Sequence, residues 1–351
     1  MKNLVIASLN FSPGHIAHLR ALSLLASYTG FNPILLLNEK YKKFECEIGL
    51  KCAYDTSVLD KNISLILIYN ISLKNINLIH LAKRKHIKTI YVLHEPYSGL
   101  LDLVNEGKNC LRMLGAALVN QYLCYLVDAV ILPSVYANKL FEENILNKTK
   151  EHYLFPLVFD DLFKSVHVER SFFSYIGNFA PAHGSSAFLD FLEYANEHAL
   201  PIKFKIATSN DISQFLSRDN VKELIKKGNL LVQHGNPISV ADINGHYKSS
   251  FCVWNLYRKS TQSGVLGNSF MMGTPVITNR IGNVNKMALH EQNSIVLDND
   301  QSNESIYKAY NIIINDFNRF SDNARKTFIN NYYYLTFADS FKKIMIQILK
   351  E

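Results

Sequence analysis

Short apolar runs of strand length alternate with helical segments along the chain, and this alternation limits the possible folds more than any other feature. In the first half the runs are Asn3–Leu9, Pro33–Leu37, Ser64–Ile68, Thr89–Leu93 and Ala129–Leu132. A strand that is apolar along its length has no face for water, so it belongs in a parallel sheet with helices over both faces. The sequence therefore predicts the α/β class.

The same pattern restarts in the second half of the chain. An apolar run at His152–Val158 is followed by a polar, irregular stretch at Phe163–Arg170, which has the character of a linker. At 351 residues the chain is long enough for two domains. Further predicted strands follow at Phe172–Ile176, Lys203–Ala207, Leu230–Gln233, Phe251–Trp254, Thr274–Ile277 and Ser294–Leu297. We therefore expect two similar α/β halves.

In open α/β sheets, ligands bind beyond the carboxyl ends of the strands. Two such sheets that face each other would place the ligand site in the cleft between them.

A short capped helix is predicted in the second half, at Ser263–Met272. Ser263 is a good N-cap because its side chain can accept from an unpaired N–H of the first turn. Gly264 leaves the backbone open to a ligand. Gly273 stands where helices commonly end in the left-handed conformation, and a buried strand is expected directly after it.

The start of this helix is a candidate anion site. Unpaired N–H groups at a helix start attract negative charge, and Arg258 and Lys259 lie just upstream, where they could close on a diphosphate. The alternative is an ordinary capped helix followed by a strand, without a ligand.

The composition is that of a well-packed globular protein, with 48% hydrophobic and 19% charged residues. No apolar run reaches the ~18 residues of a membrane-spanning helix, and the N-terminal apolar run is too short for a signal peptide. The five cysteines form no C-x-x-C pair, which argues against a metal or disulfide framework. We therefore expect a reducing, cytoplasmic location.

The net charge is +7, and part of it is gathered in two clusters, Lys40–Lys43 and Lys83–Lys88. Such clusters are usually solvated surface. The alternative is attraction to a phosphorylated substrate or to an anionic membrane. Our hypothesis is that both clusters hold the protein at the inner face of the cell membrane. A nucleic-acid partner is not expected, because no binding motif accompanies the charge.

Six motifs, taken together in their order and spacing, resemble those of the family 4 glycosyltransferases. They cover most of the chain and are Ser12-Pro13-Gly14, Val92-Leu93-His94-Glu95, Asp128 to Ser134, Pro156 to Asp160, Tyr175-Ile176-Gly177 and Gly273-Thr274-Pro275-Val276-Ile277. The resemblance implies the GT-B architecture, in which two Rossmann-like domains have parallel sheets facing across a cleft. Residues 1–165 would be the acceptor domain, 166–335 the nucleotide-sugar donor domain, and 336–351 a helix crossing back onto the first.

The resemblance also implies an activity. Such enzymes move a sugar, here a hexose, from a nucleotide-diphosphate donor to a saccharide or lipid-linked acceptor with retention of anomeric configuration. No metal or other cofactor is implied, because basic side chains and helix-start amides stabilise the diphosphate. By analogy those amides belong to Ser263, Gly264 and Val265. His94 would contact the donor sugar, and Gly14 would let the chain approach it.

The sequence departs from the family pattern before the Gly-Thr-Pro motif. The family has two glutamates eight positions apart, where this chain has Ser260 and Asn268. Asn268 can still hydrogen-bond ribose hydroxyls, because its amide both donates and accepts. Ser260 cannot carry a charge, so the usual contact to the sugar ring is altered.

The phosphate clamp departs as well. Where the family has an arginine and a lysine, this chain has Asn178 and His183, which leaves His183 as a donor-binding candidate. We expect Arg258 and Lys259 to replace the clamp, and the alternative is that both are solvated loop charges.

Two functions from different classes follow. The first is an active retaining glycosyltransferase in surface-polysaccharide synthesis, and the Lys-, Asn- and Ile-rich composition is compatible with a bacterial source. The second is a GT-B-like protein without transfer activity that serves as a binding or scaffold subunit, and the motif departures motivate it.

Overall fold

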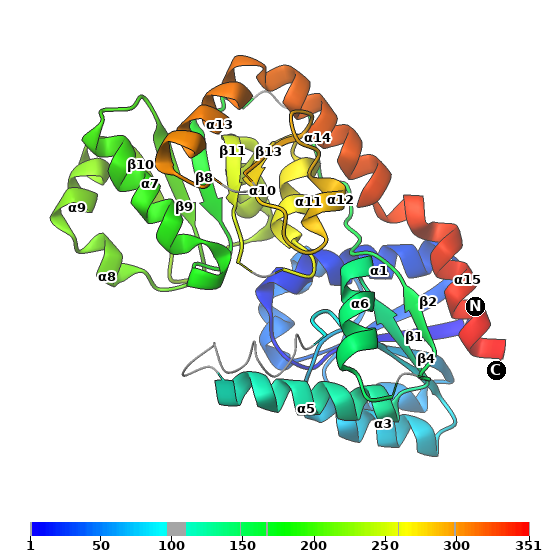
Figure 1. Ribbon diagram of the computed structural model, residues 1–351. Coiled ribbons are helices and arrows are strands. Elements are labelled where there is room, and N and C mark those ends of the chain that lie inside the picture. The colour runs from blue at the N-terminus through cyan, green and yellow to red at the C-terminus, as the bar shows by residue number, and fades with distance from the viewer. Residues whose placement is uncertain are drawn as a thin grey trace. The chain divides into compact units, whose positions relative to one another are not determined.

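The computed structural model (Figure 1) describes residues 2–96, 110–147, 149–165, 168–258, 260–297 and 300–350. The chain forms two compact units. Unit 1 contains the residues up to Asp160 and those from Tyr333 onward, and unit 2 contains Asp161–Tyr332. The sequence-based boundaries, after residues 165 and 335, lie a few residues further along the chain. The last helix, α15 (Ala338–Lys350), belongs to unit 1.

Unit 1 is built on a seven-stranded sheet in which every neighbouring pair is parallel. The strands are β1 Lys2–Ser8, β2 Phe31–Leu37, β3 Cys52–Ala53, β4 Ile63–Ile68, β5 Lys88–Val92, β6 Ala129–Leu132 and β7 His152–Leu154. Their spatial order is β3-β2-β1-β4-β5-β6-β7. The central strand β1 has no exposed surface from Leu4 to Ala7, as expected for a strand with helices on both sides.

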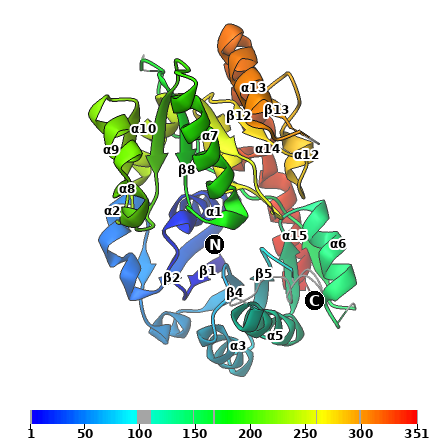
Figure 2. The same cartoon turned by 60° about the vertical axis from the view of Figure 1, so that its left-hand side comes forward.

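Helices cover both faces of this sheet. They are α1 Ile16–Tyr28, α2 Glu45–Ile48, α3 Lys74–Arg84, α5 Cys110–Leu126, α6 Val135–Asn144 and α15, with 3-10 turns η1 Pro13–His15, η2 Glu39–Phe44, η3 Thr56–Asp60 and η6 Tyr334–Phe337. One core joins Val5 and Ala7 of β1 to Leu78 of α3 and Leu123 of α5. Helices α3 and α5 pack beside each other on that face (Figure 2).

Unit 2 repeats the plan with a six-stranded parallel sheet. Its strands are β8 Phe172–Ile176, β9 Lys203–Ala207, β10 Leu230–Gln233, β11 Ser250–Asn255, β12 Val276–Thr278 and β13 Ser294–Val296. The spatial order is β10-β9-β8-β11-β12-β13. Two parallel sheets with flanking helices are what the alternating apolar pattern predicts, so the α/β class is confirmed.

The helices of unit 2 enclose a core rich in aromatic rings. They are α7 Ser185–Glu197, α8 Ser213–Leu216, α9 Asp219–Lys226, α10 Val240–Lys248, α11 Gly264–Met271, α12 Val284–Met287, α13 Asn303–Asn315 and α14 Phe317–Asn331, with the 3-10 turn η5 Pro181–His183. Phe173 on β8 lies at the centre, with Phe188, Phe204 and Trp254 within 6.1 Å between ring centroids. Edge-on and tilted ring pairs of this kind add stability beyond the area that they bury.

Arg170 links the end of α11 to the start of β11 and to the segment that leads into β12. Its guanidinium donates to the carbonyl oxygen of Met272 at 2.7 Å, just past the end of α11, and to that of Ser250 at 2.8 Å. It also donates to the hydroxyl of Thr274 at 2.7 Å. A cation is favourable at the carboxyl end of a helix, where carbonyl groups lack partners. Arg170 therefore fixes the turn that leads from α11 into β12.

One predicted strand is shorter in the structure. The apolar run His152–Val158 forms a strand only over His152–Leu154, because Pro156 lacks the N–H that a ladder needs. The two-residue strand β3 has no periodic signal of its own.

Within the described residues, no helix combines the length and apolar character that crossing a bilayer requires. The two basic clusters lie at opposite edges of the first sheet. Lys40–Lys43 follow β2 and stand at its carboxyl edge, whereas Lys83–Lys88 lead into β5 at its amino edge. They do not form one continuous patch.

Candidate functional site

In each sheet, the strand that comes first in the chain lies in the interior, and the later strands are added on both sides of it. In unit 1, β1 lies between β2 and β4, and in unit 2, β8 lies between β9 and β11. The connections on the two sides of such a strand run in opposite directions, which leaves a crevice at the carboxyl ends. The loops there are the places to look for ligand-binding groups in each unit.

In unit 1 the loop after β1 is held by buried polar side chains. The hydroxyl of Tyr41 accepts from the N–H of Ser12 at 2.9 Å and donates to the carbonyl oxygen of Ser12 at 3.1 Å. The amide of Asn70, just past β4, donates to the carbonyl oxygen of Asn10 at 2.6 Å. Gly14 follows this anchored segment and is exposed, and no described atom lies within 4 Å of where its side chain would begin.

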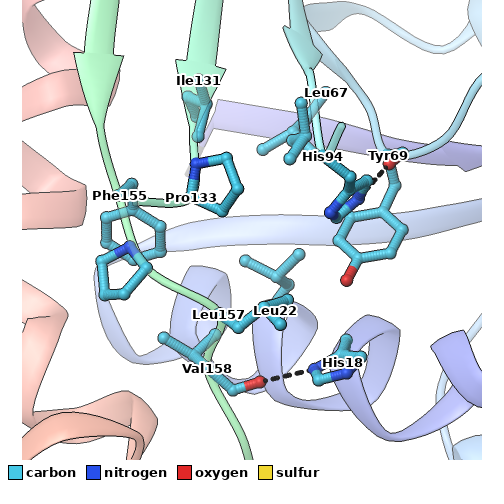
Figure 3. Close-up of a pocket in the computed structure, with 12 residues that line it drawn as sticks. His18, Leu22, Leu67, Tyr69, His94, Ile131, Pro133, Phe155, Leu157 and Val158 are labelled. Carbon is cyan, nitrogen blue, oxygen red and sulfur yellow. Dashed lines mark hydrogen bonds between the residues drawn. The ribbon is translucent and has the colours of Figure 1, made fainter. Parts of the chain in front are cut away.

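A small cavity of about 20 Å³ lies at the carboxyl ends of the strands of the first sheet. That is room for roughly one water molecule or one hydroxyl group. Figure 3 shows the rings of His94 and Tyr69 on one side of it, Pro133 and Phe155 on the other, and His18 on α1 below. The lining is mostly apolar, and His18, Tyr69 and His94 supply its polar side-chain atoms.

The two histidines in this cavity are neutral, and backbone carbonyls fix which nitrogen carries the proton. Burial lowers the pKa of His94 and that of His18 to about 4. Nε2 of His94 lies 2.7 Å from the carbonyl oxygen of Tyr69, and Nδ1 of His18 lies 3.1 Å from that of Val158. A carbonyl can only accept, so these nitrogens carry the hydrogen and the other nitrogen of each ring is an acceptor.

Two further polar groups stand next to them. Among the described residues, the hydroxyl of Tyr69 and Nδ1 of His15 are buried without a hydrogen-bond partner. The rings of His15 and His94 stack at 5.6 Å. Burial, and after it repulsion from His94, hold the pKa of His15 well below its usual range. Nothing in the residues around His94 predicts this cluster, because its members come from three segments of the chain.

In unit 2, hydrogen bonds between two strand ends position the start of α11. The side chain of Asn255, at the end of β11, donates to the hydroxyl of Thr278 at 3.1 Å and accepts from that of Ser263 at 3.0 Å. Ser263 in turn accepts from the N–H of Leu266 at 3.2 Å, which confirms it as the N-cap. The sequence alone does not predict these roles for Asn255 and Thr278, although each is a polar residue directly at the end of an apolar strand.

The exposed face at the start of α11 carries three of the predicted donor-binding residues. Gly264, Val265 and Asn268 are half-buried, whereas Leu266 and Gly267 between them are buried. Positions i and i+4 of a helix share a face, so Asn268 lies one turn beyond Gly264. The N–H groups of the first turn have no partner inside the helix, and they point toward this end.

The loop after β8 packs against the loop after β11. A Cβ atom at Gly184 would lie 2.1 Å from the carbonyl oxygen of Leu256, so only glycine fits there, and its φ is +73°. The N–H of Arg258 donates to the carbonyl oxygen of Ala182 at 2.9 Å. The ring of His183 packs on that of Tyr257 with 4.7 Å between centroids. The structure therefore brings His183 and Arg258 together within unit 2.

These two residues differ in charge. Burial lowers the pKa of His183, so at neutral pH its ring supplies no cation. Arg258 is exposed and keeps a guanidinium at the rim of the loop. Lys259, the other predicted clamp residue, lies outside the described residues. The hydroxyl of Ser260 donates to the carbonyl oxygen of Gln262 at 2.7 Å and so stabilises the loop that contains it.

In the described part of the chain, no group of three or more His, Cys, Asp or Glu side chains is placed to share a metal ion.

No protein-family model matches the chain, and no curated protein sequence does. Solved structures share the fold over nearly the whole chain at low sequence identity. A sucrose-phosphate synthase from Thermosynechococcus elongatus has a TM-score of 0.71 and 14% identity, with 100% of each chain covered. A glycosyltransferase from Rickettsia africae has a TM-score of 0.71 and 12% identity, with 100% of this chain and 99% of that one covered.

The structure of Anabaena HepE in complex with UDP-glucose has a TM-score of 0.74 and 13% identity, and covers 99% of this chain and 100% of its own. At these identities the likeness establishes the fold alone. Together with the two parallel sheets it shows that the chain has the GT-B fold of these glycosyltransferases.

Replacing Gly184 by alanine should destabilise unit 2 far more than replacing Gly228. Both glycines have a positive φ, +73° and +72°, so both replacements strain the backbone. That strain costs roughly 1–2 kcal/mol. Only Gly184 also meets a carbonyl oxygen, whereas nothing lies within 4 Å of a Cβ at Gly228 among the described residues. Overpacking adds about 1–3 kcal/mol. Urea unfolding of both variants measures the difference, and equal losses would contradict the close approach.

The neutral histidines predict that the free energy of unfolding decreases in acid. An unfolded histidine titrates near 6.5, whereas His18 and His94 have a pKa of about 4 in the folded chain. Between these values the unfolded chain binds protons that the folded chain does not, so stability is lost as the pH falls from about 6.5 to 4. Each histidine contributes up to about 1.4 kcal/mol per pH unit.

The measurement is the free energy of unfolding at pH 7 and pH 5. His18→Gln should reduce the loss between the two values, and His80→Gln, at an exposed position of α3, is the matched control. Equal pH dependence in the wild type and in His18→Gln would show that His18 binds its proton in the folded state as well.

Proposed function

We propose that this protein is a retaining, metal-independent glycosyltransferase that moves a hexose from a nucleotide-diphosphate donor to a saccharide or lipid-linked acceptor. The observation that carries the proposal is the start of α11 in unit 2. There a buried network of Asn255, Thr278 and Ser263 aims helix-start amides at the crevice beside β8, with Arg258 on the adjoining loop. The shared fold with HepE, whose structure contains UDP-glucose, supports the same reading.

The chemistry at this helix start suits a diphosphate. The N-terminal end of a helix carries about half a positive charge, which is too little for two phosphates, and Arg258 can add a full one. A guanidinium binds phosphate oxygens in a two-pronged geometry that an ammonium cannot copy. As the bond to the sugar breaks, negative charge grows on the leaving diphosphate, and fixed donors stabilise it without a metal.

The residues of unit 1 suit the uncharged part of a substrate. The cavity beside His94 has room for one hydroxyl group rather than for a sugar ring. His18 offers a neutral acceptor beside His94, and the Tyr69 hydroxyl can donate or accept. We assign to this cavity a single hydroxyl or hydroxymethyl group of a sugar, with His94 as its contact. Gly14, exposed on the neighbouring loop, leaves the ligand room to approach.

For the acceptor, we propose a growing surface polysaccharide or lipid-linked oligosaccharide in a bacterial cytoplasm, at the inner face of the cell membrane. The net charge of +7 supports an anionic surface as partner.

The second candidate is a GT-B-shaped binding or scaffold subunit without transfer activity. Two observations favour a protein without transfer activity. His183 is neutral where a clamp cation is expected, and Ser260 uses its hydroxyl within its own loop.

Nucleotide binding and turnover separate the two candidates. An enzyme should gain thermal stability from UDP or GDP, by about 2.7 kcal/mol at 100 times Kd. One member of a panel of nucleotide sugars should then release free nucleotide, and NMR of the product should show the anomeric configuration of the donor. Binding without turnover of any donor would favour the scaffold, and inversion would refute the retaining mechanism.

Arg258 is expected to matter most in the transition state. Arg258→Ala should lower kcat by ~10²-fold or more, an estimate from the loss of one oxyanion donor. Arg258→Lys should recover only part of the loss, because lysine keeps the positive charge but lacks the two-pronged guanidinium geometry. Lys259→Ala should have a smaller effect. Near wild-type transfer by Arg258→Ala, together with a loss in His183→Ala, would place the clamp in the loop after β8 instead.

A further inference from the structure

Helix α5 of unit 1 exposes an apolar face to solvent. Leu111 is 82% exposed, Leu118 63%, Tyr122 45% and Tyr125 66%. With Gly115 they follow one another at intervals of three or four residues, so they form a single stripe along the helix. Each of these side chains could have been polar at no cost to the core, so their apolar character calls for an explanation.

A neighbouring segment extends the stripe. Leu146, 86% exposed, is attached to α5 because its N–H donates to the side chain of Gln121 at 3.0 Å. The same side chain donates to the carbonyl oxygen of Asn144 at 2.6 Å. The stripe, defined as Leu111, Leu118, Tyr122, Tyr125 and Leu146, is thus a fixed part of the fold.

The helix that carries most of the stripe and the helix packed beside it contribute cations. Helices α3 and α5, which pack side by side, contain Lys74, Lys83, Arg84 and Arg112 and no aspartate or glutamate. Lys150 donates to the carbonyl oxygen of Val127 at 2.6 Å, just past the end of α5. Lys150 is attracted by Asp128 and, less strongly, repelled by Lys83. Lys88 pairs with the same carboxylate at 3.6 Å. Three lysines therefore surround one carboxylate at the carboxyl end of α5, which leaves an excess of positive charge there.

We propose that the face formed by α5 and the end of α3 lies on an anionic lipid bilayer. The leucines enter the boundary between headgroups and acyl chains, and the tyrosines stand at headgroup level, where amphipathic rings are favoured. Lys83, Arg84, Arg112 and Lys150 meet the lipid phosphates. The inference deepens the proposed function, because a lipid-linked acceptor is itself held in the membrane.

The charges favour a bilayer over a second copy of the chain. In a dimer joined through this face, the cations of α3 and α5 would lie against the same cations of the second copy. Neither helix has a carboxylate to neutralise them. An anionic headgroup layer supplies the opposite charge. The Lys40–Lys43 cluster is not needed, since it lies at the other edge of the sheet.

Sedimentation of the full chain with vesicles tests the proposal. The wild type should bind phosphatidylglycerol-containing vesicles and bind pure phosphatidylcholine vesicles weakly. Leu118→Glu should weaken binding by at least about tenfold, because a leucine leaves the apolar boundary and a negative charge enters. The double variant Lys83→Glu, Arg84→Glu should lose about fivefold or more per cation. Ile225→Glu, at an exposed position of α9 in unit 2, is the matched control and should bind like the wild type.

Thermal unfolding confirms that each variant folds, and UDP binding should be unchanged in all of them. Absence of wild-type binding to both vesicles, equal binding to both, or wild-type binding by Leu118→Glu would overturn the proposal. So would a loss of self-association in Leu118→Glu by light scattering, which would assign the face to a second copy. Failure of vesicle binding with intact nucleotide turnover would refute only this surface, and the reverse result would refute only the transfer activity.

Discussion

The central strands of both sheets are buried on both faces, and this constraint decides where polar chemistry can occur. A strand such as β1, without exposed surface from Leu4 to Ala7, cannot carry a ligand group along its length. Polar side chains therefore gather where strands end, as Asn70 does in unit 1 and Asn255 in unit 2. There they satisfy one another and the backbone groups of the loops at the same time.

The polar groups at the strand ends differ in charge between the two units. In unit 1, burial and backbone carbonyls keep His18 and His94 neutral, which makes the cavity a place for hydroxyl groups and a poor one for phosphate. In unit 2, the capped start of α11 and the exposed Arg258 carry positive charge instead.

Much of the fold could be predicted because the signals are local. Apolar runs of strand length, Ser263 as an N-cap and Gly273 in the left-handed conformation at φ +63° depend on neighbours within a few residues, and the structure confirms them. The run ending at Val158 forms a shorter strand than its apolar pattern predicts for an equally local reason, since Pro156 has no N–H for the ladder. The roles assigned to His94, Arg258 and the residues of α11 remain predictions.

The sequence by itself determined the α/β class, the order of elements and the capped helix, because backbone preferences and hydrophobic periodicity act over short distances along the chain. Only the tertiary structure decided which distant residues meet. Gly184 must be glycine because Leu256, seventy-two positions further along (256 − 184), comes within 2.1 Å of its missing side chain. The neutral histidine cluster and the uncovered stripe on α5 were likewise decided by packing, since burial depends on what the rest of the chain covers.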